Sequence, residues 1–187
     1  MKTVVKERLD CVARVLPAIA HRATEWVSLG ARFAEDGALL IGPDPTVAPE
    51  YYRIRLFPPA PEKWIEVFES RYSIPLPAEY KRVLMLVNGC SFFGLDLFGV
   101  SDSEMVDRKR QMPLQLAHAV SYWAAEYGRP GAFHFGAADW TDEMGCGYFW
   151  SGEGPCAVLS SGRVLRTWHS IRELVADEVA RLRDLSS

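Results

Sequence analysis

Leu76-Pro77-Ala78-Glu79-Tyr80, followed by Asn88-Gly89, is the stretch of this sequence that decides the fold. It predicts a short helix over about residues 77–87, because proline suits the first helical turn, where its missing N–H leaves no hydrogen bond unmade. One apolar face recurs at helical spacing and consists of Tyr80, Val83, Leu84 and Val87. Gly89 then ends the helix, since glycine adopts the left-handed conformation without a Cβ clash.

Length and composition favour one globular domain. The chain has 187 residues, of which 24% are charged, and a net charge of −3. A duplex-DNA binder would show a basic stripe, and this sequence shows none, so we expect no nucleic-acid partner. It also contains no apolar run of about 18 residues and no apolar signal-peptide core. We therefore expect a cytoplasmic protein without a membrane partner.

The cysteines and histidines are scattered and favour neither metal nor thiol chemistry. The four cysteines form no C-x-x-C pair, although their even number leaves disulfides open. No pair of metal-ligand residues has the short spacing of a structural zinc site, so we expect no metal. No phosphate-binding or dinucleotide motif occurs, so we expect no cofactor. Strand alternation places His134 on the outer face of its strand, as a surface residue.

The first third of the chain reads as an N-terminal helical extension followed by the start of the main unit. Residues 4–35 have helical periodicity interrupted at Pro17, residues 38–41 form a short apolar run, and three prolines between 43 and 49 indicate an extended connector. Residues 52–56 alternate as a strand, and a helix is predicted over 62–72. We therefore divide the chain into an extension, 1–50, and the main part of the same domain, 51–187.

The last third reads as strands followed by one helix. Residues 102–127 are predicted to be mainly helical, and strands are expected at 132–137, 146–151, 156–160 and 163–168. Ser170 and Glu173 form a capping box that starts the final helix. Helices, then strands, then a helix predict an α+β fold, in which an antiparallel β-meander packs against helices.

The segment from Trp64 to Gly89 resembles the SUKH superfamily, the group that includes Syd, a herpesviral family and a fungal cell-wall regulator. The matching parts are a tryptophan-bearing helix, a Leu-Pro-x-x-Tyr helix and an Asn-Gly pair. These parts are Trp64, Leu76, Pro77, Tyr80, Leu84, Asn88 and Gly89. The order of the later elements fits as well, so that the resemblance covers about residues 51–183.

The resemblance implies binding rather than catalysis. Many bacterial members of the superfamily are immunity proteins, each of which neutralises a cognate toxin, and the fold carries no shared catalytic residues. We therefore expect a protein toxin as the partner. Two alternatives stay open: a regulatory adaptor with an endogenous protein partner, and an unrecognised enzyme, which would need a deep pocket with convergent polar groups.

Acidic and aromatic residues gather in two predicted turns of the meander and are candidates for partner binding. They are Asp139, Trp140, Asp142, Glu143, Tyr148 and Glu153. Aromatic side chains are favoured at binding hot spots, and carboxylates would speed the capture of a basic toxin. The alternative is that these turns are polar because they lie in water, with the aromatic rings packed below. An exposed edge at Tyr51-Tyr52 or in the meander would also allow a homodimer beside the monomer.

Overall fold

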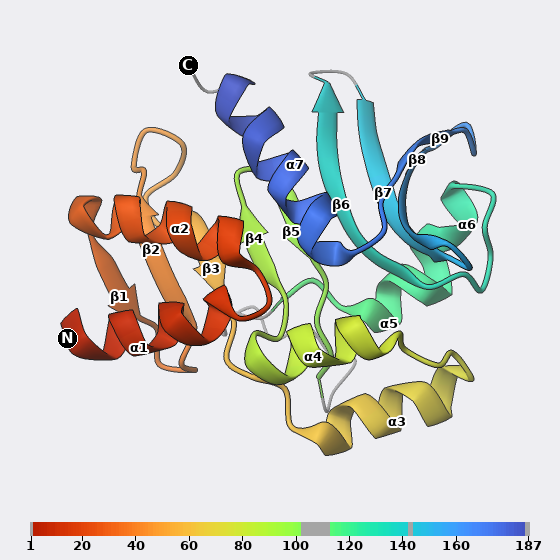
Figure 1. Cartoon of the computed structure of the whole chain (residues 1–187), viewed down its shortest axis with the longest axis horizontal. Coiled ribbons are helices and arrows are strands. Elements are labelled where there is room, and N and C mark those ends of the chain that lie inside the picture. The colour runs from red at the N-terminus through yellow and green to blue at the C-terminus, as the bar shows by residue number, and fades with distance from the viewer. Residues whose placement is uncertain (1, 102–112, 142–143, 186–187) are drawn as a thin grey trace.

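One antiparallel sheet extends through the chain in this computed structural model, which describes residues 2–101, 113–141 and 144–185. Within these residues nine strands pair in the order in which they occur in the sequence (Figure 1). The strands are β1 (Ala31–Phe33), β2 (Leu39–Pro43), β3 (Tyr52–Leu56), β4 (Cys90–Phe92), β5 (Leu95–Leu97), β6 (His134–Thr141), β7 (Met144–Ser151), β8 (Gly154–Leu159) and β9 (Val164–Thr167).

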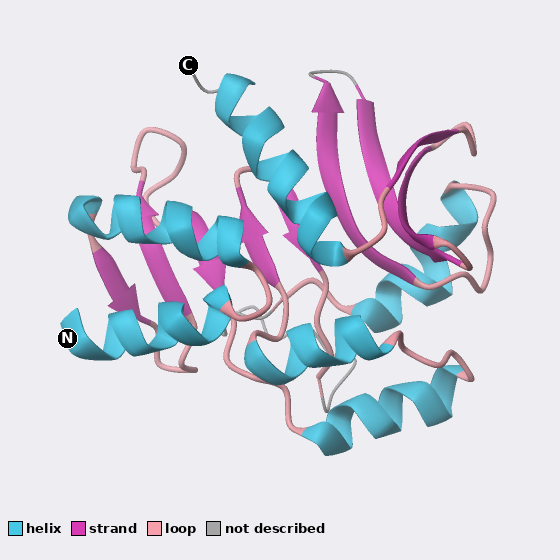
Figure 2. Ribbon diagram, viewed as in Figure 1, coloured by secondary structure: helices cyan, strands magenta, loops and turns pink. Residues whose placement is uncertain are grey.

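Helices cover both faces of this sheet. The α-helices are α1 (Lys2–Ala13), α2 (Pro17–Trp26), α3 (Glu62–Tyr72), α4 (Ala78–Leu86), α5 (Leu116–His118), α6 (Ala124–Glu126) and α7 (Ile171–Leu185), with a 3-10 turn at Val27–Leu29 and a π-helical turn at Ala119–Trp123. Figures 1 and 2 show α1, α2 and α7 in front of the sheet, α6 behind its right half, and α3 and α4 below the strand ends.

The predicted α+β class is confirmed, with one difference in the elements. The predicted helix over 62–72 is α3, and the helix over 77–87 is α4. The helical prediction for 4–35 is wrong at its end, because Ala31–Phe33 forms strand β1 and pairs with Leu39–Ile41. The expected helix over 102–112 lies outside the described residues. The N-terminal segment therefore contributes helices and also two strands of the shared sheet.

Two apolar layers explain why so much of the later sheet is buried. On the front face, Phe135 and Tyr148 join the main core with the helices α1, α2, α4 and α7. On the back face, Phe149 and Val158 pack with Ala124 of α6 in a second cluster. Strand β8 is buried at every position because it has a covered face on each side.

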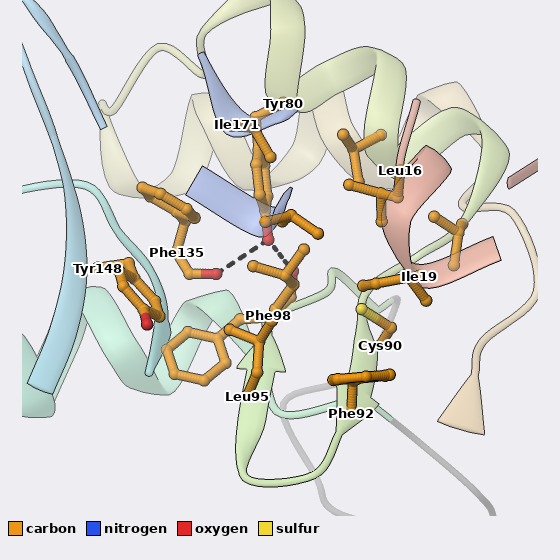
Figure 3. Packing of buried hydrophobic residues seen from close by; sticks show 14 of the residues in the cluster. Leu16, Ile19, Tyr80, Cys90, Phe92, Leu95, Phe98, Phe135, Tyr148 and Ile171 are labelled. Carbon is orange, nitrogen blue, oxygen red and sulfur yellow. Dashed lines mark hydrogen bonds between the residues drawn. The ribbon is translucent and has the colours of Figure 1, made fainter. Parts of the chain in front are cut away.

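Tyr80 of the motif helix α4 lies at the centre of the main core (Figure 3). Its hydroxyl donates to the main-chain oxygen of Phe98 and also lies 3.0 Å from the main-chain oxygen of Phe135. Leu76 and Leu84 are buried beside it. This arrangement ties α4 to the loop after β5 and to β6, so Tyr80 positions the motif helix on the sheet.

The other motif residues also act within the fold. Pro77 is the N-cap of α4, and Trp64 of α3 packs half-buried against the core. Glu69 of α3 accepts a 2.6 Å hydrogen bond from the Leu76 amide and pairs with Lys81 at 2.7 Å, which fixes α3 against α4. These contacts account for the Leu-Pro-x-x-Tyr pattern by packing alone.

Candidate protein-binding site

Asp139 lies near the end of β6, where it pairs with Gly145 of β7, and its side chain is exposed. Trp140 follows it in the strand, but the description of the structure does not extend to the Trp140 side chain. Asp142 and Glu143 lie outside the described residues. Of the predicted acidic positions in this turn, Asp139 is therefore the one whose surroundings the structure defines.

The backbone of Asp139 is held by α7 from the front face of the sheet. Arg181 Nη2 donates a 2.9 Å hydrogen bond to the Asp139 main-chain oxygen. The same guanidinium pairs with Glu178, whose carboxylate is 1% exposed, through Nε at 3.0 Å and Nη2 at 2.5 Å. A buried charge is tolerated when it is paired in this way. Asp139 is thus presented on a fixed backbone, with its own side chain in solvent.

The β4–β5 hairpin ends beside Asp139. Its two-residue turn, Phe93-Gly94, follows from the pairing of Phe92 with Leu95. The Asp139 amide donates a 3.3 Å hydrogen bond to the Gly94 main-chain oxygen. A Cβ added to Gly94 would lie 3.0 Å from Asp139 Oδ2, so the hairpin tip and the Asp139 carboxylate are in direct contact range.

Trp26, Arg53 and Phe93 pack together at this tip; with Asp139 we call them the tip cluster. The Phe93 ring stands edge-on to Trp26 at 5.0 Å between centroids. The Arg53 guanidinium lies 5.6 Å from each of these two rings, within the range of a cation–π contact. Both rings and Arg53 are half-buried. Residue types enriched at protein-binding hot spots therefore meet on the β3 side of the hairpin tip, and the exposed Asp139 carboxylate lies on its β6 side.

Trp26 and Phe93 are not among the residues that the sequence predicts for partner binding. The available signal was the spacing: two short apolar runs separated by a residue and a glycine are typical of a hairpin. Nothing in the sequence alone places the end of α2 against that hairpin.

Two predicted site residues do not join the tip cluster. Tyr148 is fully buried, with its ring against Trp168 and Phe135 on the front face, so its prediction as a surface anchor is corrected. Glu153 is exposed, but it lies in the β7–β8 turn at the opposite end of β7 from Asp139. Eight strand residues separate the two turns by roughly 25 Å. The six candidates therefore do not form one patch.

Burial shifts the pKa values of several titratable groups in the described part of the chain. The four cysteines are free thiols, and burial raises the pKa of Cys90 and brings that of Cys146 to about 11. His134, predicted at the surface, is 1% exposed, because the rings of Phe98, Tyr127 and Phe149 pack around it. Burial lowers its pKa to about 4. Raised thiol pKa values disfavour the reactive thiolate.

Metal, membrane-spanning and small-molecule sites find little support in the described part of the chain. Residues 2–101, 113–141 and 144–185 contain no group of three histidine, cysteine or acidic side chains that would hold a metal ion. None of their helices is both long and apolar enough to cross a bilayer. A shallow hollow beside α3 brings together no acidic, histidine or cysteine side chains. It is lined by Val67, Phe68, Arg71, Tyr72, Val100, Ser101, Gln115 and Ala117.

Comparison with known families gives one match. The model of the SMI1/KNR4 family (SUKH-1) matches residues 59–174, a span that includes α3, the motif helix α4, the β4–β5 hairpin and the sheet to the start of α7. Neither the curated proteins nor the solved structures gave a match. The matched span contains Phe93 and Asp139 of the tip cluster, whereas Trp26 and Arg53 precede it.

Proposed function

Because the chain belongs to the SMI1/KNR4 family (SUKH-1), we propose that it is a non-catalytic protein-binding module, and specifically an immunity protein that neutralises a cognate bacterial toxin. SUKH domains often bind protein partners, are generally non-catalytic and include toxin-immunity proteins. Toxin neutralisation by this chain, its partner and its cytoplasmic location are parts of the proposal.

The observation that carries the proposal is that the motif residues serve the fold, whereas the tip cluster lies at the surface. Tyr80 and Asn88 are buried and hydrogen-bonded within the fold, and Gly89 is packed against backbone. They build the scaffold and leave no group free for a substrate. The tip cluster is a described surface on which a tryptophan, a phenylalanine and an arginine meet, residue types that are frequent at binding sites, so we assign partner binding to it.

The physical mechanism of neutralisation would be occlusion. A toxin patch that docks on the tip cluster loses access to its own substrate, and no covalent step is required. The exposed carboxylate of Asp139 favours a basic partner and would mainly accelerate association, because complementary charge acts on the on-rate. The half-buried rings would contribute the short-range affinity.

The test is genetic and biochemical. Deletion of the gene in its native cell is expected to make the cell sensitive to the secreted toxin encoded nearby, and restoring the gene should restore resistance. The purified chain should also retain that toxin on an affinity column. Retention of an endogenous cytoplasmic protein, with no change in toxin sensitivity, would instead favour the regulatory adaptor.

A further inference from the structure

We propose that Phe93 is kept at the tip of the β4–β5 hairpin to contact a partner, and that the tip cluster receives an apolar side chain from a basic segment of that protein. This inference rests on the proposed function and names the surface and the partner chemistry.

The backbone of Phe93 is in an unfavourable conformation. Its φ is +44°, in the left-handed region, and Gly94 follows at +81°. Two consecutive positive φ angles in a two-residue hairpin loop define a type I′ turn, which strongly prefers Asn-Gly. A bulky residue with positive φ is an outlier. Asn-Gly would therefore form this turn with less strain than Phe-Gly, and strain of this kind is concentrated at functional sites.

The ring of Phe93 contributes less to the core than its neighbour does. Phe92 is 2% exposed and stacks on Trp26 with centroids 5.8 Å apart, so Phe92 provides the buried contact between β4 and α2. Phe93 is half-buried and contacts Trp26 and Phe92 edge-on, with the Arg53 guanidinium over its ring. The strained residue thus extends an apolar surface at the protein's exterior, where an incoming side chain can reach it.

The charged groups around the hairpin tip indicate the charge of the partner. The two arginines near Trp26 are neutralised within the chain, because Arg53 pairs with Asp44 at 2.9 Å and Arg22 pairs with Glu25. For the Asp139 carboxylate, the described residues supply no ion pair. Asp96 lies diagonally across from it on β5; burial raises the Asp96 pKa, the hydrogen bond from Ser91 and the charge of Arg55 lower it, and the charge of Asp139 raises it. The exposed charge next to the hairpin turn is the Asp139 carboxylate, and it fits a basic partner.

The first arm of the test measures folding alone. Phe93→Asn creates the favoured Asn-Gly turn, so we expect its melting temperature to stay within about 2 °C of the wild type or to rise. Phe93→Tyr serves as the variant that keeps a ring at the tip. A fall of more than about 4 °C in Phe93→Asn would show that the ring is required for packing, and it would overturn the inference.

The second arm measures binding with a defined probe, a phage-displayed library of random 16-residue peptides selected on the full chain. We expect the selected peptides to combine Lys or Arg with an apolar residue. Their affinity should fall at least tenfold for Phe93→Asn and stay within twofold for Phe93→Tyr and for Glu153→Gln, at the far end of β7. Equal affinity for Phe93→Asn, or selection of no peptide, would overturn the inference.

The two proposals fail in different ways. Peptides that bind at the tip, together with an absence of toxin neutralisation, would remove the immunity role and keep the tip as a binding surface. Neutralisation that Phe93→Asn leaves unchanged would keep the immunity role and place the contact elsewhere on the protein.

Discussion

The side chain of Asn88 pairs with the backbone of Val100 as a neighbouring strand would. Asn88 Nδ2 donates to the Val100 oxygen at 2.7 Å, and the Val100 amide donates to Asn88 Oδ1 at 2.8 Å. Both bonds are buried. Asn88 therefore joins the end of the motif helix to the chain that leaves β5, and the Asn-Gly pair has a structural role at each of its positions.

Substitution of Asn88 should destabilise the protein strongly. Asn88→Ala removes both hydrogen bonds and leaves the Val100 N–H and C=O without a partner. An unsatisfied buried group costs about 1–3 kcal/mol, so we expect a loss of roughly 2–5 kcal/mol for the two groups together. The measurement is the free energy of unfolding in urea. A loss below 0.5 kcal/mol, the size of an ordinary surface change, would show that the pairing contributes nothing.

Gly89 should be much less tolerant of a side chain than Gly128. Both have positive φ, +81° and +68°. A Cβ at Gly89 would lie 2.5 Å from the Leu97 oxygen, whereas a Cβ at Gly128 meets nothing within 4 Å. Gly128→Ala is therefore expected to cost about 1–2 kcal/mol from its backbone conformation, and Gly89→Ala more, because it adds an overlap with backbone.

Thermal unfolding of both alanine variants makes the comparison direct. Because the two sites share the unfavourable φ, the difference between their melting temperatures reports the overlap at Gly89. Equal melting temperatures would mean that the chain around Leu97 yields without cost, which would contradict the close packing of the motif turn.

His134 should make the protein less stable in mild acid. Its pKa is lowered by burial to about 4 in the folded protein, against 6.5 for an ordinary histidine, so the folded state prefers the neutral ring. The folded state therefore keeps its full stability above pH 6.5, where His134 is neutral in both states, and loses stability as the pH falls towards 4. At about 1.36 kcal/mol for each unit between the two values, the loss from this residue is roughly 3 kcal/mol by pH 4.

The slope of stability against pH identifies the residue. His134→Phe keeps a ring against Phe149, removes the titration and should flatten the dependence between pH 6.5 and 4. His21→Gln, at a side chain that is 79% exposed, should leave it unchanged. An identical slope in wild type and His134→Phe would contradict the assignment.

Asp139 and Glu153 should differ in partner binding. Asp139→Asn removes the exposed charge beside the hairpin tip, so we expect association with the captured partner to slow severalfold and its salt dependence to weaken. Glu153→Gln, an equal change of charge at the other end of β7, should alter neither quantity. Association rates by surface plasmon resonance at two salt concentrations measure both. A larger effect for Glu153→Gln would move the site to the β7–β8 turn.

Local signals in the sequence were sufficient for the helices α3 and α4. The bounds of α3 follow from its periodicity, and α4 follows from its proline and glycine.

Strand β1 was missed because three residues are too few to show alternation after a helical stretch. Packing of α7 on the front face explains why Glu178 is buried, since this residue lies on the core side of the helix and is paired with Arg181.

The site was harder to predict because alternation tells which strand residues share a face and not what covers that face. Tyr148 and His134 point to opposite faces, and both are buried because α7 covers one face and α6 the other. Phe93 was missed for a different reason, since its turn uses a residue that the turn type disfavours. Features that break local preferences are the least predictable, and they are enriched at functional sites.

The central claim, inhibition by occlusion, is tested most directly by titrating the purified chain into the toxin encoded beside its gene and measuring the toxin's enzymatic activity. The account predicts a linear fall to near zero at one equivalent of chain, with the loss abolished or greatly weakened for Phe93→Asn. Full toxin activity at a tenfold excess of the wild-type chain would contradict it.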